Sequence, residues 1–239
     1  MRSSTGYPVW CSSLAASQNA VVVGLELEAS LLRRTAATHG PRIYVSGPGG
    51  DRARAASREA IEAGAQALIA FGLAGGLVPA ATPGTLVLPV SIRSEAGEWR
   101  VDVPWHDRLT RVLAPRHRVI EGAIFSSPEV VTTRDAKAAL AARTGAVAVD
   151  MESAAIASAA AEAGLPFVAV RAIADGPEDA LPDNVAALVT LDGRTRYSGL
   201  LGYLAAPRRL RLLIQLARRS RRARSELERV ARVLLQCGR

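Results

Sequence analysis

The sequence has few of the residues that build metal sites and disulfide frameworks. Its only two cysteines, Cys11 and Cys237, have no second cysteine or histidine at the spacing of a zinc ligand set. We therefore expect no metal site. Lysine is almost absent, since Lys137 is the only one among 30 basic residues. Aromatic residues make up 4% of the chain and hydrophobic residues 49%, so the apolar weight lies in Ala, Val and Leu. Such a composition suits helices packed on a sheet.

The sequence also predicts neither a membrane span nor a cleaved leader. No charged residue lies between Glu62 and Arg93, but Pro79 and Pro83 interrupt this stretch and favour strand–loop–strand over one spanning helix. The N-terminus has no long apolar run and no convincing cleavage site, so we expect a cytoplasmic protein without a signal peptide. We treat residues 1–19 as a loose extension.

Positive charge is concentrated at the C-terminal end. The formal net charge is +8, but residues 205–239 hold eleven arginines against two glutamates, which leaves the remainder nearly neutral. The basic balance therefore describes this segment, and we expect no nucleic-acid partner. Mostly apolar residues recur there at alternating spacings of three and four, which predicts a basic amphipathic helix. The stripe consists of Leu213, Leu216, Ser220, Ala223, Leu227, Val230 and Leu234, of which only Ser220 is polar.

Two interpretations of this stripe stay open. It packs on the body or on a second subunit, or it forms a peripheral contact with an anionic membrane through residues 207–235. In the second case the protein would be cytoplasmic and would lie on the inner face of the membrane.

The chain between residues 20 and 204 alternates short apolar strands with helices. This pattern predicts an α/β fold of three layers, α/β/α, with a twisted, mostly parallel mixed central sheet. We predict a loop at the glycine-rich segment 72–77, where the backbone would approach a ligand or turn sharply. Residues 93–120 show no clear pattern, and we take His106 and His117 as surface or structural residues. The predicted strands cover residues 20–25, 41–45, 67–71, 86–90, 122–125, 145–148 and 166–174.

Three carboxylates stand at the ends of predicted strands: Glu28, Glu152 and Asp175. Because parallel strands end at one edge of a sheet, we expect them to converge on one pocket. Such a set suits cleavage of a glycosidic bond, in which an acid assists the leaving group and a carboxylate deprotonates water. Another interpretation is that Asp150 and Glu152 only cap the helix that follows them.

Several blocks of sequence resemble the signature of the nucleoside phosphorylase and nucleosidase superfamily. Residues 149–157 and 166–175 carry the strongest resemblance, and residues 24–28, 46–49 and 72–77 match in the same order. The pattern is similar to that of the methylthioadenosine/S-adenosylhomocysteine nucleosidases. It is most similar to the hopanoid-biosynthesis-associated phosphorylases, through the Asp-Met-Glu-Ser block, the Arg-Ala-Ile-Ala-Asp block and the Arg-rich tail after Pro-Arg-Arg.

The resemblance implies a phosphorylase/hydrolase-like fold and an enzyme that releases adenine from an adenosine-type nucleoside conjugate. In the hopanoid case the substrate would be adenosylhopane, in which the nucleoside is linked to a lipid, cleaved by phosphorolysis or hydrolysis. Two alternatives remain: a methylthioadenosine/S-adenosylhomocysteine- or futalosine-type nucleosidase, and an inactive nucleoside-binding or membrane-docking module. The resemblance implies no cofactor, with inorganic phosphate as the one possible co-substrate, and a homo-oligomer.

The resemblance also implies roles by position. Asp175 would protonate the purine at N7, Glu28 would orient a water, and Glu152 with Met151 would contact the ribose. We expect burial at the end of its strand to keep Asp175 protonated near neutral pH. Further substrate-binding candidates are Asp150 and Gly75 beside these residues, Ser127 and Val130 along the base, and Arg171, which would fix Glu152 or the strand end.

Two departures from the family pattern bear on the nucleophile. Leu73 and Ala174 stand where relatives carry serines, so two hydroxyls are missing from the site. No arginine pair stands out as a phosphate clamp, although Arg33 and Arg52 are candidates. With Glu28 in place these residues favour hydrolysis, while the phosphorylase resemblance leaves the nucleophile open.

Overall fold

The computed structural model of the chain describes residues 18–35, 40–181 and 207–236. The predictions for residues 1–17 and 182–204 therefore lie outside the described residues. The strands are β1 (Asn19–Val23), β2 (Arg42–Val45), β3 (Ala67–Gly76), β4 (Leu86–Ser94), β5 (Gly97–Arg100), β6 (Val119–Ser126), β7 (Ala146–Asp150) and β8 (Phe167–Asp175). The helices are α1 (Glu26–Thr35), α2 (Gly50–Glu62), α3 (Val103–Leu113), α4 (Arg134–Thr144), α5 (Ser153–Glu162) and α7 (Pro207–Gln236).

The strands form one mixed sheet in the order β2-β1-β3-β7-β6-β4-β5, and β8 pairs with both β3 and β4. The five strands β3, β8, β4, β6 and β7 therefore form a closed circuit. Most pairs are parallel, including β3 with β8 along most of their length. The antiparallel pairs β3–β7 and β4–β8 are short, and β4–β5 is a hairpin. This arrangement confirms the predicted mixed sheet.

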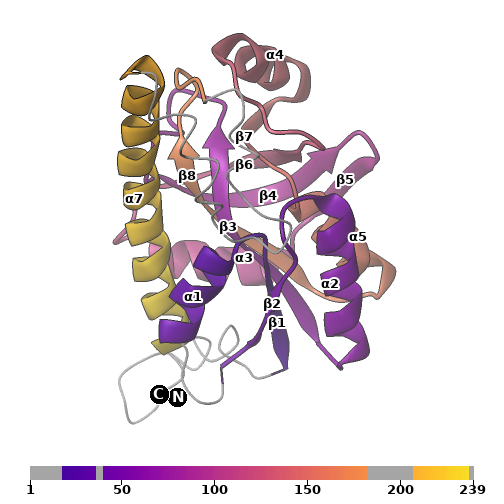
Figure 1. Ribbon diagram of the computed structural model, residues 1–239. Coiled ribbons are helices and arrows are strands. Elements are labelled where there is room, and N and C mark those ends of the chain that lie inside the picture. Colours follow the sequence, from indigo (N-terminus) through magenta and orange to yellow (C-terminus); the bar gives the residue numbers. More distant parts are fainter. Residues whose placement is uncertain (1–17, 36–39, 182–206, 237–239) are drawn as a thin grey trace.

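Helices cover both faces of the sheet, which confirms the three-layer prediction (Figure 1). On one side α1, α3 and α7 pack on the sheet, and on the other side α2 and α5 do so. Strand β1 shows why its sequence is apolar throughout. Its Val21 and Val23 belong to the first core, whereas Ala20 and Val22 belong to the second. A strand buried on both faces needs such a continuous apolar run.

Strand β3 continues through the glycine segment that the sequence predicts as a loop. Its backbone stays paired with β8 and then with β7 up to Gly76. Gly72 is required there because a Cβ atom would lie 2.5 Å from Oε1 of Glu28 and 2.6 Å from Nη1 of Arg171. The loop prediction is therefore wrong, and the glycines of β3 allow close packing of protein groups within a strand.

Residues 93–120 form the end of β4, then β5, α3 and the beginning of β6. Helix α3 begins after Asp102, whose carboxylate accepts a hydrogen bond from the backbone N–H of Trp105 at 2.9 Å. His106 is buried, with Nε2 3.2 Å from the carbonyl oxygen of Leu88. His117 lies 2.6 Å from Glu226 of α7. Both histidines therefore have structural positions.

Helix α7 packs against β8 and α1, along one side of the molecule in Figure 1. Ala223, Leu227, Val230 and Leu234 are buried in the core that α1 and α3 share. This part of the predicted stripe therefore packs on the rest of the protein, as the first interpretation predicts. The side chains before Ser220 lie outside the described residues. Among the helices of the described ranges, none combines the length and apolar composition that a bilayer crossing requires.

Candidate active site

The predicted carboxylates gather around the glycine segment of β3. Glu28 approaches Gly72, and Asp175 pairs in register with Gly75. A Cβ atom added at Gly75 would lie 3.3 Å from Oδ2 of Asp175. Glu152 lies against Gly24, where an added Cβ atom would be 3.3 Å from its Cδ. Glu28 and Glu152 therefore both lie beside Gly24 after β1, and Asp175 lies further along β3, beside Gly75.

Glu28 is a buried carboxylate in the first turn of α1. Its Oε2 accepts hydrogen bonds from the backbone N–H groups of Gly24 at 3.1 Å and Leu25 at 3.0 Å. Its Oε1 accepts one from Leu73 at 2.8 Å. Burial raises the pKa of Glu28 to about 7, although the charge of Arg171 and the backbone donors oppose this shift. Glu28 therefore changes its charge near neutral pH, where a general base works best.

Glu152 is the N-cap residue of α5 by position, but its side chain does not cap the helix. The side chain of Glu152 accepts no hydrogen bond from the N–H groups of the helix. Oε1 of Glu152 instead accepts a hydrogen bond from the N–H of Gly49 at 2.9 Å. Gly49 has a φ of 102°, a conformation that favours glycine and directs its N–H toward the carboxylate. Burial raises the pKa of Glu152, the charge of Arg171 lowers it, and nearby Asp150 raises it further. Capping therefore does not explain Glu152.

The carboxylate of Asp150, by contrast, forms hydrogen bonds and an ion pair with neighbouring protein side chains. Its Oδ1 accepts hydrogen bonds from the Ser126 hydroxyl at 2.5 Å and the Ser153 N–H at 3.3 Å, and its Oδ2 accepts one from the Ser153 hydroxyl. An ion pair of 2.7 Å joins Oδ2 to Nη2 of Arg171. Arg171 is the largest fully buried side chain of the described ranges. Its guanidinium group pairs with Asp150 and donates hydrogen bonds to the Ser153 hydroxyl, so it fixes the end of β7 by direct contact.

Lys137 of α4 is a site residue that the sequence reasoning missed. It is fully buried, and its Nζ forms an ion pair with Oδ2 of Asp175. The same Nζ donates hydrogen bonds to the carbonyl oxygens of Gly176 at 2.7 Å and Asp179 at 2.9 Å. The surroundings of Asp175 thus differ from the apolar burial expected from the sequence, because the Lys137 ammonium lies against its carboxylate. The only signal in the sequence was that Lys137 is the single lysine of the chain.

The remaining candidates lie at the same edge of the sheet. Met151 is half-buried between Asp150 and Glu152. Ser127 follows β6, and its backbone N–H donates to the carbonyl oxygen of Asp150 at 2.8 Å. Val130 is half-buried in the segment after Ser127. Within the described part of the chain, no group of three or more His, Cys, Asp or Glu side chains is arranged to hold a metal ion.

The two arginines considered for phosphate have other partners. Arg33 pairs with Glu26 at 2.5 Å on the exposed side of α1. Arg52 donates to the carbonyl oxygen of Pro48 at 2.9 Å and is exposed. The structure therefore does not bring them together as a clamp beside the carboxylates.

Comparison with known proteins agrees with this fold. The family model described as the phosphorylase superfamily matches residues 20–193. The 5'-methylthioadenosine/S-adenosylhomocysteine nucleosidase of Neisseria meningitidis, in complex with methylthio-immucillin-A, superposes with a TM-score of 0.70 at 20% identity, covering 91% of this chain and 98% of that chain. Futalosine hydrolase of Helicobacter pylori superposes with a TM-score of 0.71 at 13% identity, covering 91% of this chain and 96% of that chain. S-adenosylhomocysteine nucleosidase of Streptococcus pyogenes, in complex with 5-methylthiotubericidin, superposes with a TM-score of 0.64 at 19% identity, covering 86% of this chain and 98% of that chain.

These structural likenesses are low in identity and establish the fold. No curated protein sequence matches the chain. The family model, however, covers most of the chain, and its range includes the motifs at residues 24–28, 46–49, 72–77, 149–157 and 166–175, whereas the Arg-rich tail lies beyond it. The chain therefore belongs to the phosphorylase superfamily, and the predicted membership among the nucleoside phosphorylase and nucleosidase enzymes is confirmed.

Proposed function

We propose that the protein cleaves the N-glycosidic bond of an adenosine-type nucleoside conjugate by hydrolysis and releases adenine. The observation that carries the proposal is Glu28, a buried carboxylate whose pKa is raised to about 7 beside Gly72 and Leu73. Glycosidic cleavage needs negative charge near an oxocarbenium-like centre and a base that is ionised at working pH. The structural relatives described as nucleosidases and a futalosine hydrolase support this class of reaction.

In this reaction the bond between C1' and N9 breaks, and a bond from C1' to the water oxygen forms. Glu28 takes the proton of the attacking water. Glu152, held on one oxygen by the Gly49 N–H, accepts hydrogen bonds from the ribose hydroxyls, and Met151 packs against the sugar. Asp150 and Arg171 hold the end of β7 in place and do not reach the substrate, since their charges pair with each other.

The leaving adenine needs a proton at N7, and the ion pair of Asp175 with Lys137 supplies it. As the glycosidic bond lengthens, N7 becomes more basic and takes a proton that the Lys137 ammonium passes to it through the carboxylate of Asp175. The Lys137 amine regains a proton from solvent after turnover. The Glu28 proton then returns to solvent, so that proton balance is restored. Lys137 is thus a positioning residue that acts through Asp175, while Ser127, Val130 and Gly75 would line the base.

Hydrolysis is favoured over phosphorolysis by the charges at the site. The described cations next to the carboxylates are Arg171 and Lys137, both fully buried and paired with aspartates. A phosphate dianion placed beside Glu28 would meet carboxylates and no unpaired cation of the described residues. Water carries no such electrostatic cost.

The identity of the group attached to the nucleoside is a finer proposal. The motif resemblance supports adenosylhopane, whereas the structural relatives support small substrates such as methylthioadenosine, S-adenosylhomocysteine or futalosine. Burial of Ala223, Leu227, Val230 and Leu234 removes that part of the C-terminal helix as an argument for a lipid substrate.

Adenine release from each of these substrates, with detergent-dispersed adenosylhopane included, tests the proposal. We expect release from at least one substrate in phosphate-free buffer, and loss of release in the Glu28→Gln variant. No release from any of them would support the inactive binding module instead.

A further inference from the structure

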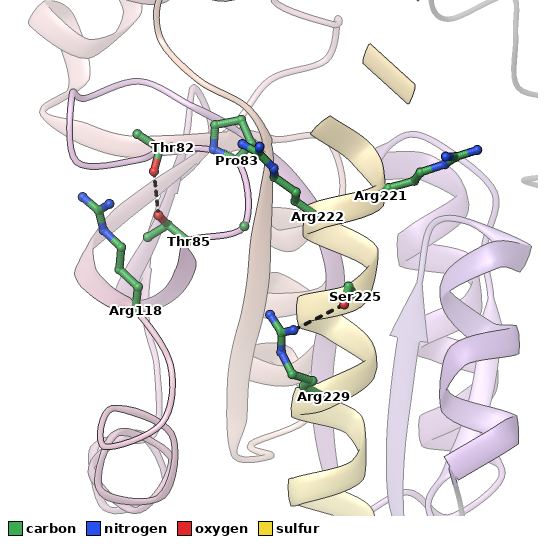
Figure 2. Close-up of a pocket in the computed structure, with 9 residues that line it drawn as sticks. Thr82, Pro83, Thr85, Arg118, Arg221, Arg222, Ser225 and Arg229 are labelled. Carbon is green, nitrogen blue, oxygen red and sulfur yellow. Dashed lines mark hydrogen bonds between the residues drawn. The ribbon is translucent and has the colours of Figure 1, made fainter. Parts of the chain in front are cut away.

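A groove of about 470 Å³ separates α7 from the turn that precedes β4 (Figure 2). Its volume lies in the range of about 300–1,000 Å³ that is typical of small-ligand pockets. The lining includes four arginines and no acidic residue. The residues that line it are Thr82, Pro83, Gly84, Thr85, Arg118, Arg221, Arg222, Ser225 and Arg229.

The guanidinium groups of this groove differ in their pairing. Arg229 forms an ion pair with Glu226 of the same helix and lies 3.4 Å from the Ser225 hydroxyl. The guanidinium groups of Arg118 and Arg222, in contrast, form no hydrogen bond or ion pair with any residue that the structure describes. Both side chains are exposed. Unpaired like charges that share one concavity repel each other, and an anion between them would relieve that repulsion.

Figure 2 shows how these side chains are arranged. Arg118 and Arg222 reach toward the turn from either side, whereas Arg221 points to the other side of α7. The hydroxyl groups of Thr82 and Thr85 form a hydrogen bond of 3.2 Å with each other in the same turn, which leaves one of the two hydroxyl protons to donate, and Thr82 is the less buried of the two. Planar guanidinium groups with nearby hydroxyl donors match the geometry of phosphate oxygens.

We propose that this groove binds a phosphate group of an anionic ligand, with Arg118 and Arg222 as its main contacts. The lining of the groove contains none of the three carboxylates Glu28, Glu152 and Asp175. The turn that lines the groove is held to β8 by two backbone hydrogen bonds. The N–H of Gly84 donates to the carbonyl oxygen of Ile173 at 2.8 Å, and the N–H of Ile173 donates to the carbonyl oxygen of Thr85 at 2.9 Å. The proposal therefore does not depend on the reaction proposed above.

The phosphate group could belong to a soluble diphosphate or to a lipid headgroup, and two probes distinguish these sources. Inorganic pyrophosphate represents the soluble ligand, and vesicles that contain phosphatidic acid represent the lipid, with phosphatidylcholine vesicles as the neutral reference. Calorimetry and vesicle co-sedimentation at low salt measure the binding of the full-length chain. Because such contacts are electrostatic, binding should weaken as salt increases.

The decisive variant carries Arg118→Gln and Arg222→Gln. Its matched control carries Arg58→Gln and Arg100→Gln, which removes the same charge from two exposed arginines of α2 and β5. We expect the groove variant to bind its probe at least about tenfold more weakly, because it loses two charge-assisted hydrogen bonds. The affinity of the control variant should change much less. Far-ultraviolet circular dichroism verifies that both variants keep the fold.

Binding of pyrophosphate without vesicle binding would assign a soluble ligand, and vesicle binding that pyrophosphate displaces would assign a lipid headgroup. Either result supports the site. The proposal is overturned if the full-length chain binds neither probe. An equal loss in the groove variant and in the control also overturns it, because binding would then depend on net charge alone.

Discussion

The raised pKa of Glu28 determines how turnover should vary with pH. Burial moves this pKa from its ordinary 4.5 to about 7. A general base acts only when it is ionised, so kcat/KM should rise with pH and level off above about pH 7. At about one pH unit below the pKa only about a tenth of the groups are ionised, so the rate at pH 6 should be about tenfold below the plateau.

The same shift has a consequence for stability. The pKa of Glu28 is higher in the folded than in the unfolded state, so between about pH 4.5 and 7 the folded state holds more protons. The free energy of unfolding contributed by this group therefore falls as pH rises through that window and is constant above it. A shift of this size corresponds to about 3 kcal/mol, since one pKa unit is worth about 1.4 kcal/mol.

The Glu28→Gln variant links both effects to this residue. It should lose about 10²-fold or more in adenine release, the scale of general base catalysis. Its urea unfolding, measured at pH 5 and pH 8, should lack the decrease in stability that Glu28 causes in the unmodified protein. An acid limb near pH 4.5, or the same pH dependence of unfolding in both proteins, would refute the reasoning.

Three further predictions concern the neighbours of Glu28. Asp175→Asn should reduce kcat by about 10²-fold or more while circular dichroism shows an intact fold, and a rate close to that of the unmodified protein would remove Asp175 from proton transfer. Lys137→Met should also lower kcat and should change the pH profile of kcat, whereas Lys137→Arg, which keeps the charge, should restore part of both; equal pH profiles in all three proteins would leave Lys137 with a structural role only. Gly72→Ala should destabilise the fold and weaken turnover, because its Cβ would lie 2.5 Å from Glu28 and 2.6 Å from Arg171. Gly50→Ala, where the nearest contact would be 3.8 Å, is its control, and equal melting temperatures would contradict the packing argument.

The positions of Glu28, Glu152 and Asp175 could be predicted from sequence because each follows a short apolar run. Apolar runs become buried strands, and parallel strands place their ends at one edge of the sheet. The helix at the C-terminal end was predictable for a similar reason, since its apolar spacing is periodic. The sequence did not determine what covers that stripe, because packing depends on β8 and α1, which are distant in the chain.

Two features depend on long-range contacts that no local pattern contains. The glycines of β3 favour a loop by their intrinsic propensity, but hydrogen bonds to β7 and β8 keep the segment extended. The ion pair of Lys137 with Asp175 joins residues 38 positions apart. Neither residue has a motif that indicates the other, so only the packing of α4 against the site reveals the pair.

The identity of the nucleophile tests the central claim most directly. The reaction can be run in isotopically labelled water without phosphate, and the sugar product analysed by mass spectrometry beside the released adenine. Hydrolysis at this site predicts free adenine and a sugar that carries the labelled oxygen at C1'. Adenine release that requires phosphate and yields a sugar 1-phosphate would contradict the hydrolytic mechanism.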